Sequence, residues 1–396
     1  MTSACPICAT KRNSVLDQRL RVPVLQNRVW PDRVSARSAP VGRLDMRLCA
    51  NCNFAWNTAF DSKLIVYDSF YDNNQLVSQA FSDHVDAMVQ RIINSLGEGA
   101  DTHLVEIGCG QGDLLRRLAK TNRFASLTGF DPAFRSVIEG HDANTRIHAC
   151  LFNKDALNLL SHPVNVVVAR HTIEHIHRPL EFLRTIRAAL DDTRPTKLFL
   201  ETPDIGWIME NFQPQDLFYE HCSIFSKRAM QIACTAAGFN LCTVSSVFSD
   251  QYLWAEVDTA DSQGTVEPNA PLIRTSDGFH AKRLDFVERW RDLITTLRKD
   301  GRVWLWGASS KGVTFALIVD PDGDLLAGAI DINLKKVGQF MPLTGVPIYD
   351  PTRLESGDSV IVMNPNYLAE ISEQIASQHK SIRLLTLDAA HFEMTA

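Results

Sequence analysis

The sequence lacks the long apolar segments that mark membrane and secreted proteins. Its most apolar short stretch, around Val164–Ala169, is far shorter than a membrane span. The N-terminus, MTSACPICATKR, has no apolar core of a secretory signal. We therefore expect no membrane contact and a cytoplasmic location. The nine cysteines should stay reduced there unless a metal binds them.

A basic run, a fixed-period repeat and a low-complexity segment are also lacking. The formal net charge of -6 argues against a nucleic-acid partner, which usually requires a basic surface. The hydrophobic fraction of 45% and the charged fraction of 22% are ordinary for a globular protein. A length of 396 residues is too great for one ordinary core, so two or three domains are expected.

Four cysteines stand in two CxxC pairs near the N-terminus: Cys5 with Cys8, and Cys49 with Cys52. Two residues between cysteines let both sulfurs turn toward one point, and two such pairs complete a tetrahedral thiolate site for Zn²⁺. Four thiolates leave no open position for substrate, so the expected zinc is structural. The 40 intervening residues exceed a usual zinc-finger loop, which leaves two unrelated cysteine pairs as the alternative.

A helical pattern follows from Lys63 to Gly97. Apolar residues recur there at spacings of three and four, at Phe81, Val85, Met88, Val89, Ile92 and Ile93. The preceding stretch, Tyr67–Gln75, is aromatic and polar. It is interpreted either as part of a binding cleft, with Tyr71 as a candidate, or as an ordinary capped loop.

The most informative segment begins at His103. A short apolar strand containing Glu106 runs into Gly108, Gly110 and Gly112 and then into a helix, an arrangement that lets a ligand approach the backbone closely. Asp131 follows the next apolar strand, where a carboxylate can accept both ribose hydroxyls of a nucleoside. The form VEIGCGQG resembles motif I of class I methyltransferases, which implies S-adenosylmethionine as cofactor. A Rossmann-like domain for another nucleotide is the alternative.

Strands and helices continue to alternate, with strands at Val164–Ala169 and Lys197–Glu201 and a helix at Pro179–Leu190. This alternation predicts a doubly wound parallel sheet, in which ligands bind at the carboxyl ends of the strands. Arg170 and His171 follow one strand directly and are therefore predicted to contact the cofactor.

Two polar clusters are candidates for catalysis. The first contains Arg170, His171, Glu174, His175 and His177, on a segment expected to be a loop; it lacks the HExxH order of a zinc site. The second, Phe218–Ser226, follows an irregular segment at Asp204–Asp216. Its Glu220–His221 pair suits proton transfer, because a nearby carboxylate can orient a histidine. A capped helix with a packed histidine is the bland alternative.

A third strand, glycine loop and helix begins at Gly301. Small residues at the helix start, together with Lys311, suit a phosphate, although the segment is no P-loop. Further strands end near Asp331 and Asn364, and an amphipathic helix at Phe279–Lys299 precedes the unit. We predict a smaller Rossmann-like α/β domain that binds a substrate nucleotide. Its candidate residues are Gly307, Ser309, Lys311, Asp331 and Asn364. A purely structural sheet is the alternative.

The order of these parts resembles the deoxysugar C-methyltransferases, across essentially the whole chain. The expected domains are a zinc-binding module at 1–62, a methyltransferase domain at 63–272 and a nucleotide-binding-like domain at 273–396. The resemblance implies a nucleotide-linked keto sugar as substrate. It also implies a cleft containing Tyr71, His175, Glu220 and His221. Phe218 departs from the family pattern, which has a tyrosine there.

The expected chemistry is methylation of a carbon next to a ketone. His221, oriented by Glu220, would remove the proton, and His175 would stabilise the enolate oxygen. O- or N-methylation of a related sugar or small metabolite is the first alternative, and a non-catalytic binding protein is the second.

Overall fold

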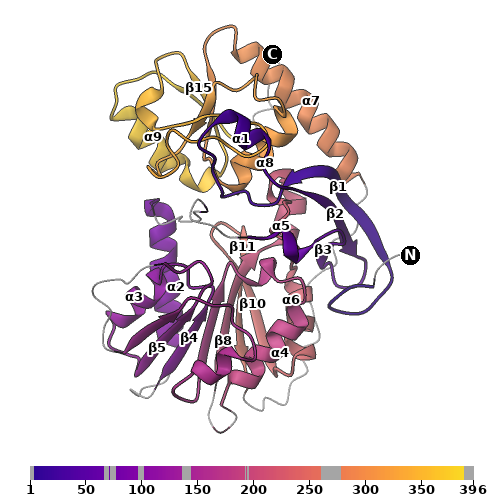
Figure 1. The fold of residues 1–396 in the computed structure, drawn as a ribbon, viewed down its shortest axis with the longest axis vertical. Coiled ribbons are helices and arrows are strands. Elements are labelled where there is room, and N and C mark those ends of the chain that lie inside the picture. Colours follow the sequence, from indigo (N-terminus) through magenta and orange to yellow (C-terminus); the bar gives the residue numbers. More distant parts are fainter. Residues whose placement is uncertain are drawn as a thin grey trace.

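The computed structural model describes residues 4–66, 71, 77–96, 102–135, 144–191, 193, 196–259 and 278–387. The chain forms three parts around three sheets (Figure 1). The boundary expected between residues 272 and 273 lies outside the described residues. So does all of the Tyr67–Gln75 stretch except Tyr71.

The N-terminal part is built on an antiparallel sheet in the order β1-β2-β3-β9. Its strands are β1 (Asn13–Pro23), β2 (Val41–Cys49), β3 (Ala55–Asn57) and β9 (Ser223–Ile224), with the short helix α1 (Arg33–Arg37) between β1 and β2. β9 comes from the central part of the chain, where Ile224 pairs with Ala55. The module expected at 1–62 therefore completes its sheet with a strand from more than 150 residues away.

The central sheet has the order β10-β11-β8-β7-β4-β5-β6. β11 runs antiparallel to both of its neighbours, and the other strand pairs are parallel. This is the doubly wound α/β sheet predicted from the sequence. Its strands are β4 (His103–Ile107), β5 (Ser126–Phe130), β6 (Thr145–His148), β7 (Val166–Arg170), β8 (Lys197–Pro203), β10 (Leu241–Val247) and β11 (Tyr252–Asp258).

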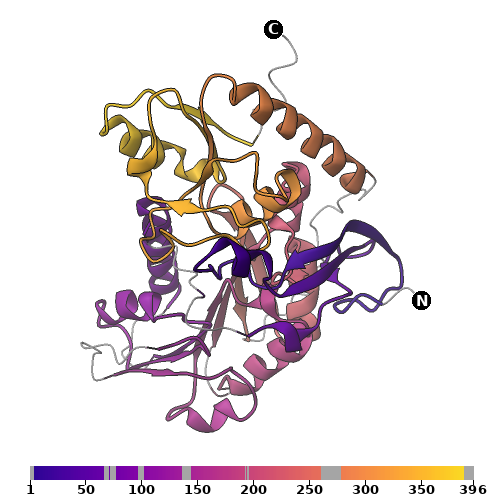
Figure 2. The same ribbon diagram turned by 45° about the horizontal axis from the view of Figure 1, so that its top comes forward.

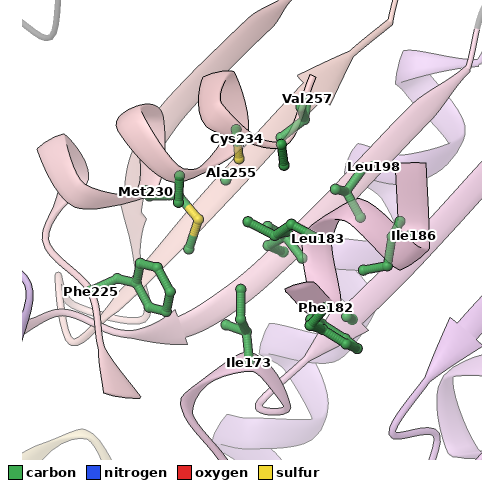
Figure 3. Close-up of a cluster of buried hydrophobic side chains, with 14 of the residues drawn as sticks. Ile173, Phe182, Leu183, Ile186, Leu198, Phe225, Met230, Cys234, Ala255 and Val257 are labelled. Atoms are coloured by element: carbon green, nitrogen blue, oxygen red, sulfur yellow. The ribbon is translucent and has the colours of Figure 1, made fainter. Parts of the chain in front are cut away.

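Helices cover both faces of this sheet: α2 (Gln79–Ser95), α3 (Asp113–Ala119), α4 (Pro179–Ala189) and α6 (Lys227–Ala236). The short helix α5 (Ile205–Glu210) packs instead against the N-terminal sheet. One core lies between α4, α6 and the sheet, where Leu183, Met230 and Ala255 pack together (Figure 3). The other lies under α2 and α3 and includes Val85, Leu115 and Trp254.

Two sequence predictions about helices were wrong in their extent. The helix expected from Lys63 begins only at Gln79, because the Ser78 hydroxyl accepts the Phe81 N–H and caps it there. The segment expected to be irregular after Asp204 contains α5, since the Asp204 carboxylate accepts the Gly206 N–H and starts a helix.

The C-terminal part is a parallel sheet in the order β14-β13-β12-β15-β16, as the sequence predicted. Its strands are β12 (Val303–Trp306), β13 (Gly328–Ile330), β14 (Ile348–Tyr349), β15 (Ser359–Val362) and β16 (Arg383–Leu385). Its helices are α7 (Phe279–Leu297), α8 (Ser310–Val319) and α9 (Leu368–Ala376). Short 3-10 turns in the chain are η1 (Ser62–Leu64), η2 (Ala156–Leu159), η3 (Ile173–His175), η4 (Pro214–Asp216), η5 (Pro351–Arg353) and η6 (Pro365–Tyr367).

The N-terminal part lies against both of the others (Figure 2). Trp30 forms a backbone bridge with Phe340 of the C-terminal part. Asp17, which is fully buried, accepts a hydrogen bond from Arg283 of α7 at 2.8 Å. Among the described residues, no helix has both the length and the apolarity needed to span a bilayer.

Candidate functional site

Four cysteines of the N-terminal part converge on one point. The sulfur atoms of Cys5, Cys8, Cys49 and Cys52 all lie within 4.8 Å of one another, and the Asn51 N–H points at the sulfur of Cys49 at 3.4 Å. Four buried or half-buried thiols at this spacing fit a closed tetrahedral metal site. The cluster packs on the central part, because Ser226, which caps α6, donates its hydroxyl hydrogen bond to the carbonyl of Cys52.

The glycine loop between β4 and α3 forms the candidate cofactor cradle. Gly108, Gly110 and Gly112 all have positive φ angles. A Cβ atom on Gly108 would lie 2.0 Å from the Thr172 hydroxyl, whereas one on Gly110 would meet nothing within 4 Å. The loop is thus packed from behind at Gly108 and open in front at Gly110.

Two carboxylates flank this loop. Glu106 is buried, burial raises its pKa to about 8, and its Oε2 atom has no hydrogen-bonding partner among the described residues. Asp131 accepts the N–H groups of Gly110 and Ala133 at 2.8 and 2.7 Å. The Glu106 carboxylate, which lacks a partner at Oε2, suits a ligand that carries positive charge. The open loop and the two carboxylates therefore fit S-adenosylmethionine, whose ammonium and sulfonium groups are cationic.

Arg170 and His171 were predicted to contact the cofactor, and the structure places both beside Glu201. Glu201 is fully buried and is bound by His84 and Arg170, with His171 Nε2 at 3.6 Å. Burial would raise the pKa of Glu201, but the charges of Arg170 and His171 and the hydrogen bonds from His171 and His84 hold it well below its usual range. His171 also lines the cleft. Burial lowers the pKa of His171, but the nearby carboxylates of Glu201 and Glu174 outweigh this effect and raise the pKa to about 9. The sequence analysis missed Glu201 and His84 as partners because they come from distant elements.

The candidate catalytic residues meet at the carboxyl ends of β7 and β8. A carboxylate oxygen of Glu174 and one ring nitrogen each of His175 and His221 lie within 4.8 Å of one another. The centroids of the two imidazole rings are 4.9 Å apart. Burial lowers the pKa of His175 and holds that of His221 well below its usual range. Both histidines are therefore neutral at neutral pH, as a general base must be.

Glu220 does not orient His221, contrary to the sequence prediction. Its Oε2 atom accepts the backbone N–H of Gln26 at 2.7 Å, and its carboxylate is also hydrogen-bonded to Tyr71. Burial raises the pKa of Glu220 to about 7, and these two bonds oppose the increase. The physical reason is that Gln26 of the N-terminal part, together with Tyr71, brings hydrogen-bond donors to this carboxylate.

The aromatic residues before Glu220 have separate environments. Phe218 lines the cleft, with its ring centroid 3.9 Å from that of His221. Tyr219 is fully buried beneath the N-terminal sheet, where its hydroxyl accepts the Asp61 N–H at 2.8 Å. Tyr219 therefore offers no hydroxyl to the cleft in place of the one that Phe218 lacks.

A single cleft joins this cluster to the C-terminal part. It is lined from the central part by residues such as Glu174, His175 and His221, and from the C-terminal part by Gly307, Ser309, Lys311, Asp331 and Asn364. All five residues predicted to bind a substrate nucleotide thus line the cleft that contains the histidines. Its walls also include Trp207 and Tyr252, whose rings offer apolar surface.

The glycine loop of the C-terminal part is held by buried polar contacts. Asp331 accepts the Ala308 N–H at 2.9 Å, and Gly312 admits the Gly307 carbonyl so closely that a Cβ would lie 1.8 Å from it. Lys311 bonds to Asp216 of the central part at 3.0 Å, so its charge already has a partner. Lys336, which the sequence analysis missed, is buried in the cleft wall and donates to Ser309 at 2.6 Å.

Comparison with known proteins identifies two domains. Residues 78–244 match the model of a methyltransferase domain. Residues 271–384 match the model of a C-methyltransferase C-terminal domain. No curated protein matches the chain.

Several solved structures match part of the chain. A candidate O-methyltransferase of Nostoc punctiforme is 15% identical, with a TM-score of 0.36; the match covers 45% of this chain and 57% of that one, little more than half its length. A mycolic acid cyclopropane synthase complexed with SAH and CTAB is 12% identical, with a TM-score of 0.36; the match covers 50% of this chain and 90% of that one. A SAM-dependent methyltransferase of Aquifex aeolicus is 14% identical, with a TM-score of 0.36; the match covers 47% and 96%.

The two domain models agree with the sheet order and with the glycine loop after β4. The chain is therefore an S-adenosylmethionine-dependent methyltransferase with a C-methyltransferase C-terminal domain.

Proposed function

We propose that the enzyme transfers a methyl group to a carbon atom of a nucleotide-linked keto-deoxysugar. The observation that carries this proposal is the single cleft shared by the histidine cluster and the C-terminal glycine loop. A nucleotide sugar needs such a site, because one end must be anchored while the other end reaches the methyl donor. The resemblance to the deoxysugar C-methyltransferases supports the same substrate class. We also propose that the enzyme is cytoplasmic.

The donor supplies a methyl group that is already activated as a sulfonium. The enzyme must generate a carbanion on the substrate. His221 is half-buried and its pKa is well below the usual range, so its neutral ring can accept the proton from the carbon beside the ketone. Phe218 covers one face of its ring and helps to keep water out. Glu106 and Asp131 are proposed to hold the cationic and ribose portions of the donor. Gly108, Gly110 and Gly112 lie beneath it.

The nucleotide is proposed to bind along α8 and the loop before it. The helix directs its N-terminus at the cleft, where its backbone N–H groups favour a diphosphate. A structural Zn²⁺ is proposed at Cys5, Cys8, Cys49 and Cys52, with no part in the chemistry, since four thiolates leave no open position.

The test is solvent exchange followed by product analysis. The purified enzyme is mixed with nucleotide-linked keto sugars in deuterated buffer without the methyl donor. Deuterium should enter the carbon next to the ketone, since only carbanion chemistry predicts that exchange. The donor is then added, and NMR should show a new carbon–carbon bond at that position. Methylation at oxygen or nitrogen without exchange would refute the proposal, and His221→Gln should abolish exchange while SAH still binds.

A further inference from the structure

We propose that Glu174, His175 and His221 form a second metal site, which binds a divalent transition cation such as Zn²⁺ or Co²⁺ and blocks proton removal while it is occupied. Only this effect on the reaction rests on the proposed function, because the site itself is argued from three side chains. Glu174 and His175 lie in the turn η3 directly after β7, far along the chain from the four cysteines of the N-terminal part.

Each of the three side chains has a buried polar atom that is available to an ion. Glu174 Oε1 and the Nδ1 atoms of His175 and His221 are buried and have no hydrogen-bonding partner among the described residues. One carboxylate oxygen of Glu174 and one nitrogen of each ring lie within 4.8 Å of one another. A buried polar atom without a partner costs free energy, so the convergence of three such atoms favours a cation between them.

The two imidazole rings are spaced as ligands of one ion. Their centroids are 4.9 Å apart, and their planes meet at 85°. A metal–nitrogen distance of about 2.0–2.1 Å places the centroids of two imidazoles roughly 5 Å apart around a tetrahedral ion. Two histidines and one carboxylate form a known class of zinc site with an open fourth position. Nitrogen ligands also favour Zn²⁺ or Co²⁺ over Mg²⁺ and Ca²⁺.

Neighbouring groups hold two of the ligands in the state that a metal requires. The Thr202 hydroxyl donates to Glu174 Oε2 at 3.1 Å, which leaves Oε1 as the oxygen for an ion. A ring N–H of His175 donates to the backbone carbonyl of Glu220. Because His175 Nδ1 has no partner, this donor is Nε2, and the neutral ring carries its lone pair on Nδ1. Metal ligands in proteins typically have outer hydrogen bonds of this kind.

The charges around the site limit its affinity. His171 Nδ1 lies 3.4 Å from Glu174 Oε1, and the positive charges of His171 and Lys311 both act on His221. Glu201 lies 3.6 Å from His171 Nε2 and balances part of that charge. We therefore expect weaker binding than at the four cysteines, and reversible occupancy. An ion can enter from the cleft, because all three ligands line it.

Occupancy of this site stops the proposed reaction at its first step. A neutral imidazole has one nitrogen lone pair, and a bond to a metal uses it. His221 can then no longer accept the proton from the carbon beside the ketone. Since the substrate is proposed to occupy the same cleft, bound substrate should exclude the ion.

The first test measures binding and needs no turnover. The full-length protein is saturated with one equivalent of Zn²⁺, which the four thiolates bind most tightly, and is then titrated with Co²⁺ by calorimetry and visible absorption. We expect one further equivalent to bind, with the d–d bands of Co²⁺ and without the charge-transfer band that a cysteine ligand would add. A zinc-loaded protein that binds no Co²⁺ would overturn the proposal.

Variants then locate the bound Co²⁺. Glu174→Gln and His175→Gln should each weaken Co²⁺ binding at least roughly tenfold, because each removes one ligand. The matched control is His162→Gln, which changes an exposed histidine stacked on His103 at the amino-terminal end of β4 and should bind Co²⁺ like the parent.

A further variant covers the case in which the first two do not fold. Thr202→Val keeps all three ligands and removes only the hydroxyl bond to Glu174, so it should weaken Co²⁺ binding about tenfold. Parent-like Co²⁺ affinity in every folded variant of these three would overturn the assignment of the ligands.

The last test concerns the reaction. Co²⁺ at a concentration that fills the site should lower deuterium exchange at the carbon beside the ketone at least roughly tenfold, and a chelator that removes Co²⁺ should restore it. Exchange that persists at full occupancy would overturn the blocking role. Failure of the proposed function would appear separately, as an enzyme without exchange before any Co²⁺ is added, whereas the Co²⁺ titration would still report on the metal site.

Discussion

Replacing Gly110 by alanine separates ligand binding from folding at the cofactor cradle. A methyl group at Gly110 meets nothing within 4 Å, so it projects into the open front of the loop, where the donor is proposed to lie. The φ angle of +55° costs an alanine about 1–2 kcal/mol. We expect Gly110→Ala to lower the melting temperature by a few degrees and to weaken SAH binding at least roughly tenfold, since the added carbon occupies the ligand's space.

Gly108→Ala is the matched comparison. Its φ angle of +72° carries a similar strain. Its Cβ would in addition lie 2.0 Å from the Thr172 hydroxyl, which donates to the Ile107 carbonyl. Overpacking of this kind adds about 1–3 kcal/mol, so Gly108→Ala should be the less stable variant. Thermal unfolding and calorimetric titration with SAH measure the two effects. Parent-like SAH affinity in folded Gly110→Ala would refute the reasoning that places the donor in front of this loop.

Three further predictions concern stability and the metal. Burial raises the pKa of Glu106 to about 8 and that of Glu220 to about 7, so the folded state binds more protons than the unfolded state between about pH 4.5 and 8. The free energy of unfolding of the ligand-free enzyme should therefore fall as the pH rises through this range. In urea unfolding, Glu106→Gln should flatten this fall, and the variant should also lose SAH affinity. Tyr219→Phe removes a hydroxyl bonded to Asp61, so it should cost about 1–2 kcal/mol in unfolding yet leave kcat near the parent value; a large loss of kcat would place Tyr219 in the chemistry. Removal of the proposed zinc by a chelator should lower methyl transfer roughly tenfold or more while SAH still binds, since the β3–β9 pairing lies beside His221; unaltered turnover in protein shown to be metal-free would contradict this.

The strand, glycine loop and helix of the candidate cofactor site were largely predictable because their signals are local. A strand, three glycines and a helix occur within a dozen residues, and Asp131 stands at the end of the next strand, where the topology of parallel sheets brings it to the same edge. The central and C-terminal sheets followed from the same alternation. These features need no knowledge of distant contacts.

The contacts that decide the roles of the polar residues were not predictable in this way. Glu220 stands next to His221, yet its carboxylate is taken by the backbone N–H of Gln26, a group that every non-proline residue has and no pattern reveals. His84 reaches Glu201 across 117 positions of sequence. Proximity along the chain therefore did not predict the partners of Glu220, which come from other parts of the structure.

The strand β9 has a consequence for how this enzyme can be rearranged. It begins two positions after His221 and pairs with β3, so the loop that carries His221 is the last stretch of the central domain before its chain enters the sheet of another part. A chimaera that exchanges the central domain alone would leave β3 with a foreign edge and Glu220 without the Gln26 donor. Variants of new acceptor specificity should therefore exchange the N-terminal part and the central domain as one inherited unit.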